Sequence, residues 1–247
     1  MRSSTAKPYR GFSMEGPIAT WYARNAAKDA VEYRRAAMRI AGALDEGADV
    51  LDVATGPGHL AIELAKLSAR LGELGPGRIT GVDISKSFVR IAEENARSAG
   101  VDVRFQLSDA QALPFADESF DAVVCRAAFK NFAEPVKALD EMARVLNPGG
   151  FGLIMDLNRE TPAREIDDYV DRMPMGAISR SMTRFIFKHM LIKRAYAPSD
   201  FARMAALSRF EGCEIRPTGI GVDVWLRKPG RATKIRVERD FSPLLFV

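Results

Sequence analysis

The stretch VLDVATGPGHLAIELAK, residues 50–66, constrains the fold of this chain more than any other. An apolar run ends with an aspartate, two glycines follow two residues apart, and an amphipathic segment begins directly after them. This order predicts a buried strand, a tight turn and a helix. The free N–H groups at the start of such a helix favour a carboxylate or phosphate at the turn. We therefore expect a sheet whose strands end at a ligand-binding edge.

Strand and helix patterns alternate over most of the chain. The expected strands are residues 49–54, 78–84, 101–107, 120–127 and 151–157, and the expected helices between them are 58–71, 86–100 and 134–146. This alternation predicts an α/β fold with a mostly parallel sheet, helices on both faces, and ligands at the carboxyl ends of the strands. Asn147-Pro148-Gly149-Gly150 is expected to end the last of these helices, with both glycines in left-handed conformations.

The remaining segments flank this alternating part. Residues 1–16 are polar and expected to be mobile, and Pro17 suits the first turn of a helix from Ile18 to about Leu44. Residues 157–197 show no strand pattern and predict two helical pieces. A helix from Pro198 to Phe210 and two strands, 213–221 and 222–228, follow, and the strands are expected to form an antiparallel hairpin at the edge of the sheet.

These patterns divide the chain into an N-terminal helical lid segment, residues 1–44, and one α/β domain, residues 45–247. The domain carries a helical lid insertion at 157–197 and a C-terminal extension at 231–247. The extension ends in the apolar sequence FSPLLFV, which is expected to dock on the domain or on a second copy of the chain.

Composition excludes several classes of protein. Hydrophobic residues make up 47% and charged residues 28% of the chain, as in a soluble globular protein. No apolar run approaches the roughly 18 residues that span a bilayer, and residues 1–30 lack the apolar block of a signal peptide, so the cytoplasm is the expected compartment. Cys125, Cys213 and the two histidines show no metal-ligand spacing, so no metal is expected. The net charge of +4 does not require nucleic acid.

The turn by itself leaves its ligand open. From Gly56 it reads G-P-G-H-L-A, which fits a dinucleotide-binding turn, a turn for the methionine end of S-adenosylmethionine, or a structural turn without a ligand. Asp83 ends the second strand, where it can accept the ribose hydroxyls of either cofactor or cap the helix that begins near Ser85. None of the five tyrosines has the lysine four residues later that a short-chain dehydrogenase needs.

Later stretches resolve this choice through a resemblance. VLDVATGPGHLAIELAK, ITGVDIS, QLSDAQALPFADESFDAVVCRAAFKNF and ALDEMARVLNPGG resemble, in order and spacing, the class I S-adenosylmethionine-dependent methyltransferases. The resemblance covers about residues 45–157 and is strongest to the branch of ubiquinone/menaquinone-biosynthesis C-methyltransferases and their small-molecule relatives. It implies a three-layer, Rossmann-like sheet of about seven strands with an antiparallel edge hairpin and a helical lid. The implied cofactor is S-adenosyl-L-methionine, with S-adenosyl-L-homocysteine as product.

The resemblance also assigns residues to the cofactor. They are Asp52, Ala54, Gly56 and Gly58 around the methionine part, Asp83 at the ribose, Ile84, Asp109 and Ala110 at the adenine, and Arg126 and Ala127 beneath the methionyl group. Ala54 stands where the family has its first glycine, and we expect this substitution to be tolerated if the backbone there has a negative φ.

Acceptor and base are less specified. Trp21, Tyr22, Phe129 and Lys130 are candidates to face the substrate, although the aromatic residues also suit a core and Lys130 also suits a helix cap. His189 and Asp156 are candidate general bases, each with packing or surface exposure as the alternative. Residues 179–194 contain basic side chains and no acid, which predicts either attraction of anionic or membrane-bound substrates or a solvated basic face.

The predicted function is methyl transfer by in-line displacement to an O, N, S or C atom of a small, fairly apolar molecule. The alternatives are a nucleic-acid methyltransferase and a non-catalytic S-adenosylmethionine-binding interaction protein. Base-amine methyltransferases usually carry N/D-P-P-Y/F after the fourth strand, where this chain has Cys125–Phe129, so no nucleic-acid partner is expected. A homodimer and peripheral contact with a membrane are further expectations.

Overall fold

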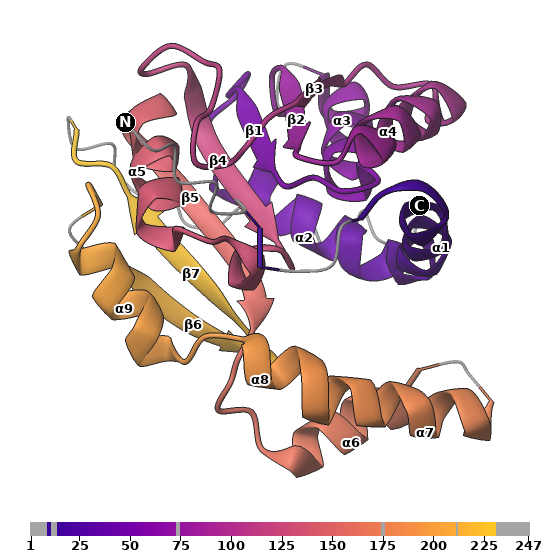
Figure 1. Cartoon of the computed structure of the whole chain (residues 1–247). Helices are drawn as coiled ribbons and strands as arrows, with labels where there is room; N and C mark the ends of the chain where they lie inside the picture. Colours follow the sequence, from indigo (N-terminus) through magenta and orange to yellow (C-terminus); the bar gives the residue numbers. More distant parts are fainter. Residues whose placement is uncertain (1–8, 11–13, 73–74, 174–175, 211, 231–247) are drawn as a thin grey trace, which may run out of the picture.

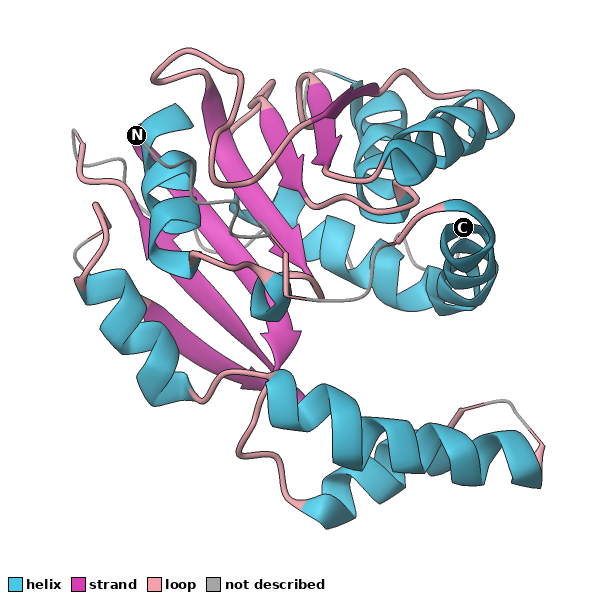
Figure 2. Ribbon diagram, in the orientation of Figure 1, coloured by secondary structure: helices cyan, strands magenta, loops and turns pink. Residues whose placement is uncertain are grey.

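A seven-stranded sheet forms the centre of the protein (Figures 1 and 2). The computed structural model describes residues 9–10, 14–72, 75–173, 176–210 and 212–230. The strands are β1 (Val50–Val53), β2 (Ile79–Asp83), β3 (Arg104–Leu107), β4 (Phe120–Arg126), β5 (Leu146–Leu157), β6 (Glu214–Thr218) and β7 (Gly221–Arg227). Their order is β3-β2-β1-β4-β5-β7-β6; β1 to β5 pair in parallel, and β7 joins β5 and β6 antiparallel. The predicted mixed sheet with an antiparallel edge hairpin is confirmed.

Helices cover both faces of the sheet, as predicted. They are α1 (Gly16–Ala26), η1 (Ala27–Asp29), α2 (Ala30–Ala43), α3 (His59–Leu71), α4 (Lys86–Ala99), η3 (Phe129–Asn131), α5 (Pro135–Val145), α6 (Ala163–Asp171), α7 (Ala177–Ile186), η4 (Phe187–Leu191), α8 (Ile192–Arg194) and α9 (Pro198–Ala206). Side chains of α2 and α3 pack on one face with Val50 and Val124, and those of α5 and α9 pack on the other with Leu51 and Val123. Period-two alternation along β1 and β4 thus supplies both cores.

The structure corrects two expected element boundaries. The helix from Ile18 to Leu44 is interrupted by the 3-10 turn η1, so α1 and α2 are separate helices. The Asn147–Gly150 segment belongs to β5, and only Gly149 has a left-handed φ, of 86°. At Gly150 a Cβ atom would lie 2.6 Å from the carbonyl oxygen of Asp121, so close packing explains this glycine and helix termination does not.

Part of the N-terminal stretch that was expected to be mobile is docked on the sheet edge. Arg10 donates its backbone N–H to the carbonyl of Asn131 over 2.8 Å, just after β4. The carboxylate of Glu15 accepts the backbone N–H groups of Lys86 and Ser87, at 3.0 and 3.1 Å, and so caps α4 after β2. Because an acidic side chain stabilises free N–H groups at a helix start, Glu15 fixes the entry to α1 over the carboxyl end of β2.

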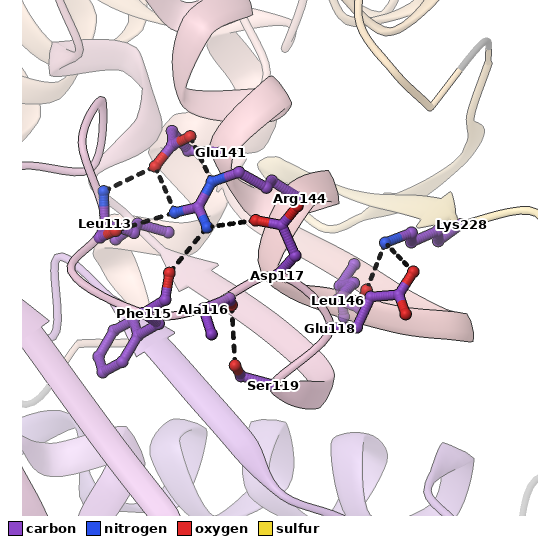
Figure 3. A network of polar contacts seen from close by, with 10 residues as sticks. All are labelled: Leu113, Phe115, Ala116, Asp117, Glu118, Ser119, Glu141, Arg144, Leu146 and Lys228. Atoms are coloured by element: carbon purple, nitrogen blue, oxygen red, sulfur yellow. Dashed lines mark hydrogen bonds and ion pairs between the residues drawn. The ribbon is translucent and has the colours of Figure 1, made fainter.

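The loop before β4 is held by one arginine (Figure 3). The guanidinium of Arg144 on α5 pairs with Glu141 at 2.7 Å and Asp117 at 2.9 Å, and it donates to the carbonyl oxygens of Leu113 and Phe115. The rings of Phe115 and Phe120 pack edge to face with centroids 5.0 Å apart. The interpretation of this segment as a structural turn with an aromatic core is confirmed.

The insertion after β5 forms α6 to α8, which extend away from the sheet (Figure 1). Arg184 pairs with Asp167 at 2.9 Å and with Asp171 at 2.7 Å, and Lys188 pairs with Asp167 at 2.6 Å. The expectation of a basic face is therefore wrong for Arg184 and Lys188, because acidic side chains on α6 pair with them. In the described ranges, no helix combines the length and apolarity needed to cross a membrane. The C-terminal extension lies outside the described residues, and the domain division stays a prediction.

Candidate functional site

The turn after β1 is built from left-handed residues. Ala54, Gly56 and Gly58 have φ values of 57°, 56° and 81°. A Cβ atom at Gly58 would lie 2.8 Å from the ring of Phe105, whereas one at Gly56 would meet nothing within 4 Å. Gly58 is thus required by packing and backbone conformation, and Gly56 by conformation alone. The expectation of a negative φ at Ala54 is wrong.

Replacing Ala54 with glycine should stabilise the protein by about 1 kcal/mol, because an L-residue in the left-handed region is strained by roughly that amount. Urea unfolding of Ala54→Gly checks this. Ala61→Gly on α3, where the backbone is helical, is the matched control and should lose stability instead. Equal or lower stability of Ala54→Gly would contradict the strain at this turn.

Asp52 lies beneath the turn, only 2% exposed. Its Oδ2 accepts a hydrogen bond of 2.6 Å from the hydroxyl of Thr55. Burial raises the pKa of Asp52 to about 7, with a further contribution from the charge of Asp83, because a carboxylate loses its hydration in the interior. Asp52 is therefore an acidic group that a nearby positive charge would stabilise in its ionised form.

Asp83 ends β2 and links three parts of the site. Its Oδ2 accepts the backbone N–H of Gly56 at 2.8 Å, and its Oδ1 accepts that of Ser85 at 2.9 Å. Ser85 rather than Asp83 caps α4, since its hydroxyl accepts the N–H of Phe88. Burial raises the pKa of Asp83 to about 6. Asp83 thus holds the turn against β2 and orients its carboxylate there.

The predicted adenine residues lie beside this carboxylate. Ile84 directly follows β2 and is 42% exposed, so its side chain offers an open apolar surface. The backbone N–H of Ser108 donates to the carbonyl of Asp83 at 2.9 Å, which ties the 108–110 segment to β2. Asp109 is held by the backbone and side-chain N–H groups of Gln111, and Ala110 is buried. These residues follow β2 and β3, and their assignment to the adenine stays a prediction.

Arg126 and Ala127 lie at the carboxyl end of β4. Ala127 has a φ of 59°, and its N–H donates to the carbonyl of Met155 on β5 at 2.8 Å. The guanidinium carbon of Arg126 lies 4.2 Å from the centroid of the Tyr33 ring. Tyr33, on α2, carried no functional signal in the sequence, because only the fold brings α2 over the end of β4.

The loop after β4 rests on a buried ion pair. Lys130 Nζ lies 2.8 Å from Asp156 Oδ1, and the backbone N–H of Lys130 donates to Asp156 Oδ2. Phe129 is 0% exposed and packs with the rings of Phe132 and Phe201. Phe129 and Lys130 were candidates to face the substrate, with a core position and a helix cap as the alternatives. Both residues are buried in the structure, and their assignment to the substrate stays a prediction.

The remaining candidates lie farther out. Tyr22 packs on Phe88 of α4 with ring centroids 5.6 Å apart, and Trp21 is 65% exposed on α1. His189 is exposed on η4, with its ring 4.6 Å from that of Phe185. The structure therefore groups the residues assigned to the cofactor along one edge of the sheet. Among the described residues, no hydrogen bond or ring contact joins His189 to them.

Comparisons with known proteins match this part of the chain. A family model described as a methyltransferase domain matches residues 44–195, more than half of the chain. The ubiquinone/menaquinone biosynthesis C-methyltransferase of Bdellovibrio bacteriovorus is 37% identical over 127 residues, which cover 51% of this chain and 51% of that protein. A demethylmenaquinone methyltransferase of Thermus thermophilus is 43% identical over 108 residues, which cover 43% of this chain and 46% of that protein.

The chain thus matches about half the length of these curated relatives. Among solved structures, a SAM-dependent methyltransferase of Aquifex aeolicus superposes with a TM-score of 0.55 at 22% identity, covering 75% of this chain and 85% of that chain. This likeness shows a shared fold. The span matched by the family model contains the whole strand edge from Asp52 to Asp156.

Proposed function

The chain belongs to the methyltransferase-domain family, and from this premise we propose that it transfers a methyl group from S-adenosylmethionine to a small, fairly apolar acceptor. The observation that carries the proposal is the pair of buried carboxylates, Asp52 and Asp83, at the turn after β1. Buried carboxylates are costly unless something compensates their charge or donates hydrogen bonds to them. A cationic cofactor with a ribose diol supplies both.

The residues at this edge fit such a cofactor. The N–H groups at the start of α3 suit its carboxylate, and the carboxylate of Asp83 suits its ribose hydroxyls. Ile84 offers exposed apolar surface for the adenine, and Gly56 leaves the space before the turn free of a Cβ atom. S-adenosylmethionine supplies a methyl group on a positively charged sulfur when it is bound.

The chain's own part in the reaction is alignment. Holding an acceptor atom in line with the methyl group can supply about 7 to 11 kcal/mol of the barrier. The loop after β4 is suited to this task because Ala127 is fixed to β5 by its N–H and Lys130 is fixed to Asp156. A rigid loop keeps the groups around the acceptor in one arrangement.

A general base is needed only where the acceptor must lose a proton, and it would add about 10² to 10⁴ in rate. Asp156 already accepts hydrogen bonds at both oxygens, from Lys130 and from the N–H of Leu157. His189 stands exposed on η4. Because neither side chain is positioned as a free base, the structure favours an acceptor that is already ionised when it binds. The assignments of Asp156 and His189 as general bases stay predictions.

Calorimetric titration with S-adenosylmethionine tests the cofactor proposal, and folded protein that binds none would refute it. Asp83→Asn should weaken binding by about 1.5 to 3 kcal/mol, because it removes a charged acceptor at the ribose while preserving side-chain volume. Asp45→Asn, at an exposed carboxylate before β1, is the matched control and should bind like wild type. An unchanged affinity of Asp83→Asn would contradict the ribose assignment.

The acceptor is best sought among apolar ring compounds. The two curated relatives are named for quinone methylation, which supports quinols and phenols as the first acceptors to test. Incubation with labelled cofactor and mass detection of the methylated product identifies the acceptor. Cofactor binding without transfer to any compound would instead favour the non-catalytic alternative.

Location and assembly stay predictions: a cytoplasmic protein, a homodimer and peripheral contact with a membrane. The exposed apolar side chains of Ile178, Met182 and Phe185 on α7 support contacts with a second copy or a membrane.

A further inference from the structure

Arg126 stands at the reacting edge without an acidic partner. It is the last residue of β4, and the next residue, Ala127, is fixed to β5 by its backbone N–H. Other partly buried arginines are paired: Arg39 lies 3.1 Å from Asp223, and Arg144 lies 2.7 Å from Glu141. In the part of the chain that the structure describes, no carboxylate lies within ion-pairing distance of Arg126.

The surroundings of the Arg126 guanidinium favour an oxyanion as its partner. The guanidinium carbon lies 4.2 Å from the centroid of the Tyr33 ring, a cation–π contact that supports the group without an ion pair. A guanidinium supported in this way is preorganised for two parallel hydrogen bonds to an oxyanion. The charge of Arg126 acts to lower the pKa of Asp29 and of Asp52, but neither carboxylate forms an ion pair with it.

Tyrosine side chains interact electrostatically with this cation, and one of them, Tyr33, is in direct contact with it. The charge of Arg126 acts on the phenols of Tyr22, Tyr33 and Tyr169, which come from α1, α2 and α6. Three helices from distant parts of the sequence therefore bring phenol groups within electrostatic range of one arginine, and the ring of Tyr33 is in contact with it. A flat apolar ring beside a cation suits an aromatic compound with a negative group.

We propose that Arg126 binds an oxyanion of the methyl acceptor, a carboxylate or an ionised phenol, so that the chain selects flat aromatic acceptors with a negative charge. This inference rests on the proposed function. It also accounts for an edge where neither base candidate is poised, because an ionised phenol needs no base. The α-carboxylate of the cofactor shares this chemistry, so the test measures both ligands.

Two probes of matched shape test the proposal: 1-naphthoate, which is anionic, and 1-naphthamide, which is neutral. Both are titrated calorimetrically into protein saturated with S-adenosylhomocysteine, whose own affinity is measured first. Wild type should bind naphthoate about 10 to 100-fold more tightly than naphthamide, as expected for hydrogen bonds between charged groups. Arg126→Gln should bind both probes equally, and Arg126→Lys should keep part of the preference.

The control is Arg70→Gln, an equal loss of charge at the exposed end of α3, and it should match wild type. Failure of wild type to bind S-adenosylhomocysteine would refute the proposed function before any probe is added. With that binding intact, the inference about Arg126 is overturned by equal binding of the two probes, by binding of neither, or by a preference that persists in Arg126→Gln. Loss of S-adenosylhomocysteine affinity in Arg126→Gln, with the probe preference unchanged, would assign Arg126 to the cofactor instead.

Discussion

Replacing Lys130 by methionine is expected to destabilise the protein by about 3 to 5 kcal/mol, because it leaves a buried carboxylate without its cation. The side chains of Lys130 and Asp156 are 7% and 1% exposed, and their charged atoms lie 2.8 Å apart. Nζ of Lys130 also donates to the carbonyl of Ala127 at 2.6 Å. The variant therefore loses the ion pair and the anchor of the loop after β4 together.

Urea unfolding at neutral pH measures this effect, and Lys137→Met provides the control. Lys137 on α5 pairs with Glu134 at 3.7 Å, but both side chains are well exposed, so its loss should cost at most about 1 kcal/mol. The double variant Lys130→Met/Asp156→Leu should recover much of the lost stability, because it removes both buried charges. A single variant as stable as Lys137→Met would show that this pair does not hold the loop.

Local sequence patterns predicted the parts of the site that short segments determine. The turn after β1 needs a left-handed backbone at Gly56 and Gly58, and each strand end follows from an apolar run that stops at a polar residue. Asp52 and Asp83 were therefore found at the ends of β1 and β2. The φ of Ala54 was not, since alanine gives no signal of a left-handed conformation.

Contacts between distant segments account for what the sequence did not predict. Glu15 caps a helix that begins at Lys86, and Tyr33 meets Arg126 only because α2 crosses the end of β4. The basic residues of α7 and η4 appeared unpaired along the chain, yet Asp167 of α6 lies against Arg184 and Lys188. Charge patterning in one segment cannot show which acid another helix will bring to it.

Asp52→Asn is expected to stabilise the ligand-free protein at pH 8 and to leave its stability nearly unchanged at pH 4. The pKa of Asp52 is raised to about 7 by burial, whereas in an unfolded chain it is about 3.9. Below the lower value both states are protonated and the group costs nothing. Between the two values the unfolded chain releases its proton while the folded protein keeps it, so stability falls as the pH rises. The loss is complete above the higher value and is on the order of 4 kcal/mol for a shift of about three pKa units.

The difference in unfolding free energy between wild type and Asp52→Asn, followed from pH 4 to pH 8, isolates this group because the other titrations cancel. Asp117→Asn is a control of opposite sign: Arg144 lowers the pKa of Asp117, so this variant should gain no stability as the pH rises. A constant difference for Asp52→Asn would refute the burial argument.

If the proposed function holds, the same variant should lose more affinity for S-adenosylmethionine than for S-adenosylhomocysteine, because only the former carries the positive charge that stabilises ionised Asp52. The cost of burying ionised Asp52 in the free protein would then be the reason why the site prefers the charged cofactor.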